Sequence, residues 1–313
     1  MKDQAEFKWS FVLPQYWPIW FGVGLLWLVG KLPHETKYKV GAWFGRVIFH
    51  IAKNRRKLAL ANITLAFPQL DPQARLSVLK QHFESLGISF IELTFIWWGR
   101  YHSDSVDNES KYVTFHGIEN LRQAEAQGKG VLVIFPHFTH IDSTNFFFSF
   151  ASPLMPVYRP NDNPVLDYLI LKARTLGKRK QVNIPFNETR SIVKALKQGN
   201  DVGFLPDQRY RSRGHIKVPF FDHMAKSHSS TSKIAKMTGC AVVLMFTRRI
   251  GCHYEIQFLP ALDNFPSGDD YADTLRLHQL YEAEIRQNPS QYLWVHNRWD
   301  LRPDASGQFV EKR

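Results

Sequence analysis

The sequence predicts an α/β protein in which helices flank a mixed central sheet, preceded by an N-terminal membrane-anchoring helix. No charged residue occurs from Trp9 to Gly30. Apolar residues recur at helical spacing between residues 36 and 98, and short apolar or β-branched runs alternate with helical stretches after Tyr112. We expect an anchor at 1–31 and one domain at 32–313, made of a helical part (32–110) and an α/β core (111–305).

The uncharged N-terminal stretch comprises 22 residues. As one helix it would measure roughly 33 Å, about the thickness of a bilayer core. A helix that spans or inserts deeply is the favoured interpretation. A helix lying in the membrane interface and a buried helix remain open, because Pro14 and Pro18 weaken the case for a straight span. Lysine and arginine dominate the flank after the stretch, which predicts that the rest of the chain is cytoplasmic.

In the helical part, Asp71 and Pro72 supply an N-cap and a first-turn proline for a helix that continues through an apolar stretch to Trp98. In the α/β core, the predicted helices several times end at a glycine, as at Gly239. The predicted strands are 112–115, 131–135, 155–158, 202–205, 241–246 and 254–259. The predicted helices between them are 118–127, 143–151, 164–176, 188–198, 226–238 and 270–287.

The chain is basic, with 40 Lys and Arg against 28 Asp and Glu, a net charge of +12. Such a charge favours an anionic partner: nucleic acid, anionic lipid or an acidic protein. The basic run 53–57 fits either a solvated helix face or contact with lipid headgroups. Two cysteines, Cys240 and Cys252, are too few for a disulfide scaffold.

Several common catalytic motifs do not occur in this sequence, namely GxSxG, the Walker A loop and HExxH. The remaining pattern is His137 followed five residues later by Asp142, directly after the predicted strand 131–135. The carboxyl ends of such strands commonly bind ligands. Asp142 would hold one ring N–H of His137, and the other nitrogen would take a proton from a substrate hydroxyl. From spacing alone, a strand-end histidine and a simple helix N-cap explain the pattern equally well.

Two further loops follow predicted strands and carry polar side chains. Arg159 and Asn161 lie in one loop, and Asp207, Gln208 and Arg209 lie in the other. A guanidinium group binds phosphate through a planar pair of donors. Together with the predicted base, these residues favour an anionic substrate.

These motifs resemble the lipid A biosynthesis acyltransferases, the lauroyl/myristoyl group of the lysophospholipid acyltransferase superfamily. The resemblance covers nearly the whole chain, and the order and spacing of its motifs are specific. It is carried by the Trp-rich N-terminus ending at Lys31-Leu32-Pro33, Asn54-Arg55-Arg56, Pro136-His137 to Asp142, Tyr158 to Pro164, Pro206-Asp207-Gln208, Val218 to Phe221 and Trp294 to Trp299.

The resemblance implies transfer of a fatty acyl chain from acyl carrier protein to a hydroxyacyl group of Kdo2-lipid IVA. It places the enzyme at the cytoplasmic face of a bacterial inner membrane, in contact with its lipids. His137 and Asp142 would be catalytic, and Arg159 with the Arg209 loop would hold the glucosamine phosphates. Asp207 would order that loop. No metal, cofactor or nucleic acid is expected.

This sequence departs from the family pattern at two places. Asp142 stands where members acting on lipid A commonly have Glu, and the loop after Asp207 lacks the Asp-Tyr-Gly-Pro sequence often found there. These differences leave the acyl position and chain length open, although the Tyr158 to Pro164 stretch looks closer to the lauroyl-transferring branch. The alternatives are another lysophospholipid or glycolipid acceptor, or a non-catalytic lipid-binding protein.

Overall fold

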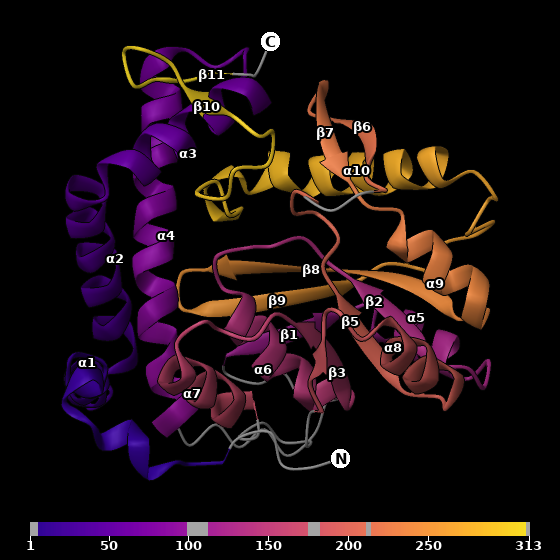
Figure 1. Ribbon diagram of the computed structural model, residues 1–313, viewed down its shortest axis with the longest axis horizontal. Helices are drawn as coiled ribbons and strands as arrows, with labels where there is room; N and C mark the ends of the chain where they lie inside the picture. Colours follow the sequence, from indigo (N-terminus) through magenta and orange to yellow (C-terminus); the bar gives the residue numbers. More distant parts are fainter. Residues whose placement is uncertain (1–5, 99–111, 175–181, 211–213, 311–313) are drawn as a thin grey trace.

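A central sheet with helices on both faces forms the core of the computed structural model, which describes residues 6–98, 112–174, 182–210 and 214–310. Figure 1 shows the long helices α2 (His34–Ile51) and α4 (Pro72–Trp98) upright at one end of this sheet. The α/β prediction is therefore confirmed.

The predicted N-terminal spanning helix is wrong. The uncharged stretch divides into two short 3-10 turns, Trp9–Val12 and Pro14–Tyr16, and helix α1 (Trp17–Val29). A proline lacks the N–H of a helix interior and clashes with the preceding turn, so each proline here lies in the first turn of an element. The 13 residues of α1 measure about 20 Å, against about 30 Å for a bilayer core. Within the described ranges, no helix combines the length and the apolarity that a membrane span requires.

Helices occupy most of the described residues in the part predicted at 32–110; residues 99–111 lie outside the described ranges. It consists of α2, α3 (Lys53–Ala66) and α4. Asp71 caps α4 as predicted, since its carboxylate accepts from the backbone N–H groups of Gln73 (2.7 Å) and Ala74 (2.9 Å). Helices α2 and α4 touch through main chain, because a Cβ on Gly87 would overlap backbone atoms of Gly41 and Gly45. This contact fixes α4 against the rest of the helical layer.

Within the described ranges the main sheet has seven strands in the order β1-β9-β8-β2-β5-β3-β4. Strands β8, β2, β5, β3 and β4 are parallel, whereas β9 runs antiparallel to β8 and pairs in parallel with β1. All six predicted strands are present, and β4 is additional. The bounds are β1 Val113–His116, β2 Val131–Ile134, β3 Leu154–Tyr158, β4 Ile184–Pro185, β5 Asp201–Phe204, β8 Ala241–Ile250 and β9 His253–Phe258.

The six predicted helices of the core also form; that predicted at 270–287 has the predicted bounds, and the others differ by a few residues where they are described. The largest shift is at the helix predicted for 226–238, which begins at Ser230 because residues up to Ser227 belong to an unpredicted hairpin. The helices are α5 Ile118–Glu125, α6 Ile141–Ala151, α7 Pro164–Arg174, α8 Thr189–Lys197, α9 Ser230–Thr238 and α10 Asp270–Gln287. The hairpin is β6 (Ile216–Phe220) with β7 (His223–Ser227); a 3-10 turn, Pro289–Gln291, and a small pair, β10 (Arg302–Pro303) with β11 (Phe309–Val310), follow α10.

Candidate active site

The neighbouring strands β2 and β5 bring His137 and Asp207 together. Ile134, the last residue of β2, pairs in parallel with Phe204, the last residue of β5. His137 and Asp207 each lie three residues beyond that pair. Because parallel strands end at the same edge of a sheet, the two loops meet there.

A hydrogen bond of 2.6 Å joins Nδ1 of His137 to Oδ1 of Asp207. The other carboxylate oxygen accepts from the backbone N–H of His137 (2.9 Å) and from the hydroxyl of Tyr292 (3.0 Å). The Asp207 side chain is 1% exposed and that of His137 is 23% exposed. The imidazole is therefore accessible, while its carboxylate partner is sealed behind it.

The protonation state of this pair follows from its charges. Burial alone would raise the pKa of Asp207, but the attraction and hydrogen bonds of His137, with a contribution from Arg298, lower that pKa to about 2. An ionised carboxylate only accepts hydrogen bonds, so Nδ1 of His137 carries the proton. In the neutral ring, Nε2 then holds the free lone pair. This arrangement suits a general base.

The C-terminal segment supports the histidine turn. The backbone N–H of Leu293 donates to the carbonyl of His137 (3.0 Å), and that of Thr139 donates to the carbonyl of Gln291 (2.8 Å). Asn62 on α3 donates to the carbonyls that follow, those of Trp294 and His296 (both 2.7 Å). The segment is thereby held between α3 and the turn.

Asp142 does not make the predicted hydrogen bond to His137. Its carboxylate faces the guanidinium of Arg174 at 4.0 Å and is 45% exposed, whereas the hydrogen bond expected of it at His137 is made by Asp207. Partial loss of hydration raises the pKa of Asp142, and Arg174 opposes that rise. The reason is geometric: Asp142 already lies in the first turn of α6, which leads away from the histidine. The predicted pairing is corrected to His137 with Asp207.

Comparison with known proteins decides the family. Residues 4–300 match the family described as bacterial lipid A biosynthesis acyltransferase. Two similar proteins of Escherichia coli (strain K12) are a lipid A biosynthesis lauroyltransferase, 30% identical over 97% of this chain and 98% of its own, and a lipid A biosynthesis palmitoleoyltransferase, 30% identical over 97% of each. A myristoyltransferase of the same organism is 22% identical over 93% of this chain and 89% of its own.

The chain belongs to the bacterial lipid A biosynthesis acyltransferases.

In this acyltransferase, the residues predicted to bind phosphate separate into two groups. Arg159 is 74% exposed, and its nearest carboxylate is that of Asp162 at 3.8 Å. Asn161 is also exposed and helps shape its own loop, since its side-chain oxygen accepts from the backbone of Asn163 (2.9 Å). These two residues are accessible to a ligand.

The second predicted group is engaged inside the protein. Arg209 is 8% exposed and ion-paired with Asp300, and its backbone N–H donates to His296 (3.2 Å). Gln208 is half-buried, and Asp207 is bonded to His137. In the described structure Asp207 orients the histidine and Arg209 binds the C-terminal segment, and the substrate contact of Arg209 stays a prediction.

Sequence reasoning missed Tyr292 and Arg298 as parts of the acyltransferase site. Arg298 is buried and donates to the carbonyl of Lys226 (2.9 Å) and to the hydroxyl of Ser227 (2.6 Å). Its charge contributes to the low pKa of Asp207. The motif at 294–299 pointed to this segment, but nothing in the sequence located it near Asp207.

Proposed function

We propose that this enzyme transfers a fatty acyl chain, lauroyl in the first instance, from acyl carrier protein to a hydroxyacyl group of Kdo2-lipid IVA. The observation that carries the proposal is the partly exposed imidazole of His137, whose Nδ1–H is held by an ionised carboxylate. Family membership supports the acyl transfer and the lipid A acceptor. The higher identity to lauroyl- and palmitoleoyltransferases than to a myristoyltransferase disfavours a myristoyl chain, and the Tyr158 to Pro164 stretch supports lauroyl.

In the proposed mechanism, Nε2 of His137 removes the proton from the acceptor hydroxyl as its oxygen attacks the thioester carbonyl. Asp207 stabilises the imidazolium that forms. The tetrahedral intermediate then expels the thiolate, which takes the proton from the imidazolium, so an ester and a free thiol are produced and the base is restored. A positioned base of this kind contributes about 10²–10⁴ in rate.

Arg159 is the residue that we propose for the phosphate of the acceptor. Its ion pair with Asp162 is exposed to solvent, and such pairs contribute little free energy. A phosphate can therefore replace the carboxylate at the guanidinium and form two charge-assisted hydrogen bonds. Asn161 in the same loop offers a neutral donor.

The N-terminal elements are proposed to lie in the interface of the inner membrane, with the catalytic part on its cytoplasmic face. Helix α1 has no fully buried residue, and several of its apolar side chains are exposed in the described structure. Aromatic residues that sit at membrane interfaces are among them. The exposed apolar residues of this region are Phe7, Trp9, Val12, Leu13, Trp17, Phe21, Leu25, Trp27, Leu28 and Leu32.

The direct test incubates the purified protein with Kdo2-lipid IVA and lauroyl acyl carrier protein and records product mass. We expect a mass gain of one acyl chain, lost in His137→Ala. A lysophospholipid or another glycolipid in place of Kdo2-lipid IVA tests the alternative acceptors. Binding of lipid without a mass gain would instead indicate a non-catalytic lipid-binding protein, and unchanged turnover by His137→Ala would refute the assigned base.

A further inference from the structure

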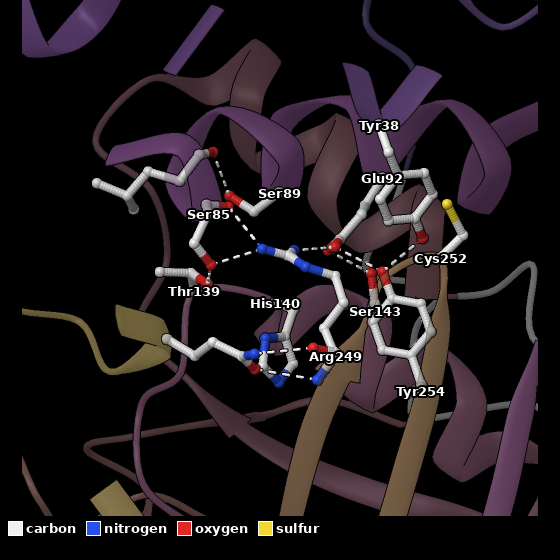
Figure 2. Close-up of polar contacts among 12 residues, drawn as sticks. Tyr38, Ser85, Ser89, Glu92, Thr139, His140, Ser143, Arg249, Cys252 and Tyr254 are labelled. Carbon is white, nitrogen blue, oxygen red and sulfur yellow. Dashed lines mark hydrogen bonds and ion pairs between the residues drawn. The ribbon is translucent and has the colours of Figure 1, made fainter. Parts of the chain in front are cut away.

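A buried ion pair is linked by hydrogen bonds to the residues that follow His137. Glu92 of α4 and Arg249 of β8 are both buried and bonded to each other. Figure 2 shows the Arg249 guanidinium between Glu92 on one side and Ser85 with Thr139 on the other. The mechanism proposed above makes no use of this pair.

The pair is bonded to residues at both ends of the segment that follows His137. At one end, Glu92 accepts from the hydroxyl of Ser143 (2.7 Å), the residue after Asp142. At the other end, Arg249 donates to the hydroxyl of Ser85 (2.5 Å), which is hydrogen-bonded to the hydroxyl of Thr139 (2.6 Å).

A second path joins Arg249 to the same segment. The side chain of Gln291 accepts from the backbone N–H of Arg249 (3.0 Å) and donates to its carbonyl (2.8 Å). The carbonyl of Gln291 in turn accepts from the N–H of Thr139 (2.8 Å). Strand β8 can make these contacts because it extends beyond the end of β2, with which it is parallel. The turn is therefore held by the side chain and the backbone of one arginine.

Stability is a poor reason for this arrangement. Removing two charges from water costs several kcal/mol for each ion, and well-packed apolar residues often serve a core equally well. What an ion pair adds is direction, because each hydrogen bond fixes the partner's orientation. We propose that Glu92 and Arg249 are positioning residues that set the geometry of the turn carrying His137. This inference rests on the proposed function of that histidine.

The test removes the ion pair while keeping the volume filled, in the double variant Glu92→Leu/Arg249→Met. We expect kcat to fall roughly 10- to 100-fold with an unchanged KM for the lipid acceptor, since misplacement by about 1 Å costs on this scale. The control is Arg248→Met/Glu284→Leu, which removes the neighbouring ion pair of β8; its bonds run to α10. Its kcat should remain within about twofold of the wild type when both proteins are folded.

Two further measurements keep the inference testable if the double variant does not fold. Thr139→Val removes the hydroxyl bonded to Ser85 and should lower kcat about threefold to tenfold, whereas Thr139→Ser keeps it and should restore the rate. Proton NMR of the Nδ1–H of His137 reports its bond to Asp207 without any substrate. We expect this resonance to shift in Thr139→Val and to stay in place in Thr139→Ser.

An equal loss of kcat in the double variant and its control, or equal behaviour of the two Thr139 variants, would overturn the inference. Absence of acyl transfer by the wild type would count against the proposed function alone. The NMR comparison of the two Thr139 variants needs no substrate and still tests whether the link from Arg249 through Ser85 to Thr139 positions the histidine.

Discussion

Asp207 and Glu92 are two buried carboxylates that contact the same turn in different ways. Asp207 bonds the imidazole of His137 directly, whereas Glu92 reaches only Ser143 and, through Arg249 and Ser85, Thr139. The first sets the tautomer of the base, and the second affects only where the base lies. A carboxylate that contacts the ring should therefore be far more costly to alter than one that contacts the backbone turn around it.

The largest loss of kcat is expected for Asp207→Asn, which tests the direct contact with the imidazole. The amide can donate to Nδ1, which would favour the tautomer with a protonated Nε2 and lower kcat by roughly 10³-fold. Steady-state kinetics measure this loss. Tyr292→Phe serves as the control, because it removes one donor to Asp207 and leaves the carboxylate in place; its kcat should fall less than about tenfold.

Acid should destabilise the folded protein. Burial lowers the pKa of His82 and His140 to about 4 and that of His278 to about 3, with Arg249 adding to the effect at His140 and Arg298 at His278. These rings are neutral when folded and gain protons near pH 6.5 when unfolded. Their contribution is complete above pH 6.5 and is lost progressively as the pH falls to about 4, at about 3 kcal/mol each for His82 and His140 and more for His278.

Thermal unfolding at pH 8, 7, 6 and 5 measures this dependence, and we expect the melting temperature to drop below pH 6.5. Asp201, whose pKa burial raises to about 7, acts in the opposite direction, against the three histidine rings. His82→Asn should flatten the slope by about one proton. A melting temperature that stays constant from pH 7 to pH 5 would contradict these buried neutral rings.

Asp142→Asn tests the pairing that the sequence predicted. Because Asp142 faces Arg174 and not the imidazole, we expect kcat to fall only about tenfold, much less than for Asp207→Asn. The two variants are compared in one assay, with Arg174→Met showing what loss of the Arg174 charge alone does. If Asp142→Asn were as damaging as Asp207→Asn, Asp142 would have to contact the histidine during the reaction.

The smallest effect is expected at Arg159, which is exposed and belongs neither to the His137–Asp207 pair nor to the Glu92–Arg249 pair. Arg159→Ala should raise the KM for the phosphorylated acceptor about threefold to tenfold and leave kcat unchanged. Arg276→Ala, at an exposed arginine of α10 paired with Asp263, is the control. A dephosphorylated acceptor should abolish the difference between the wild type and Arg159→Ala; a difference that persists would exclude the phosphate contact.

The elements of the core could be predicted because apolar runs and glycine stops are local signals. The β6–β7 hairpin escaped prediction because residues 223–227 include His223 and Lys226 and lack a clear strand pattern. The partner of His137 escaped for a different reason. Its identity depends on β2 lying beside β5, and strand order is a property of the folded sheet that no spacing along the chain reveals.

The N-terminal stretch was predicted wrongly because its composition was given too much weight. Its lack of charge predicted a span, but two prolines decide how far a helix can continue. At Arg209 the residue type was likewise right for phosphate, and the burial of its side chain against Asp300 could not be foreseen.

Asp300 partly neutralises the positive charge that the basic composition predicts on one flank of the protein. Its single carboxylate is the counterion of Arg209, Lys226 (3.0 Å) and Arg302 (3.5 Å). Where several cations share one anion, their fields partly cancel, and the remainder decays over about 8 Å at physiological ionic strength. A count of lysines and arginines therefore overstates the attraction felt by an approaching polyanion on this flank. Selectivity there must come from shape and individual donors more than from bulk charge.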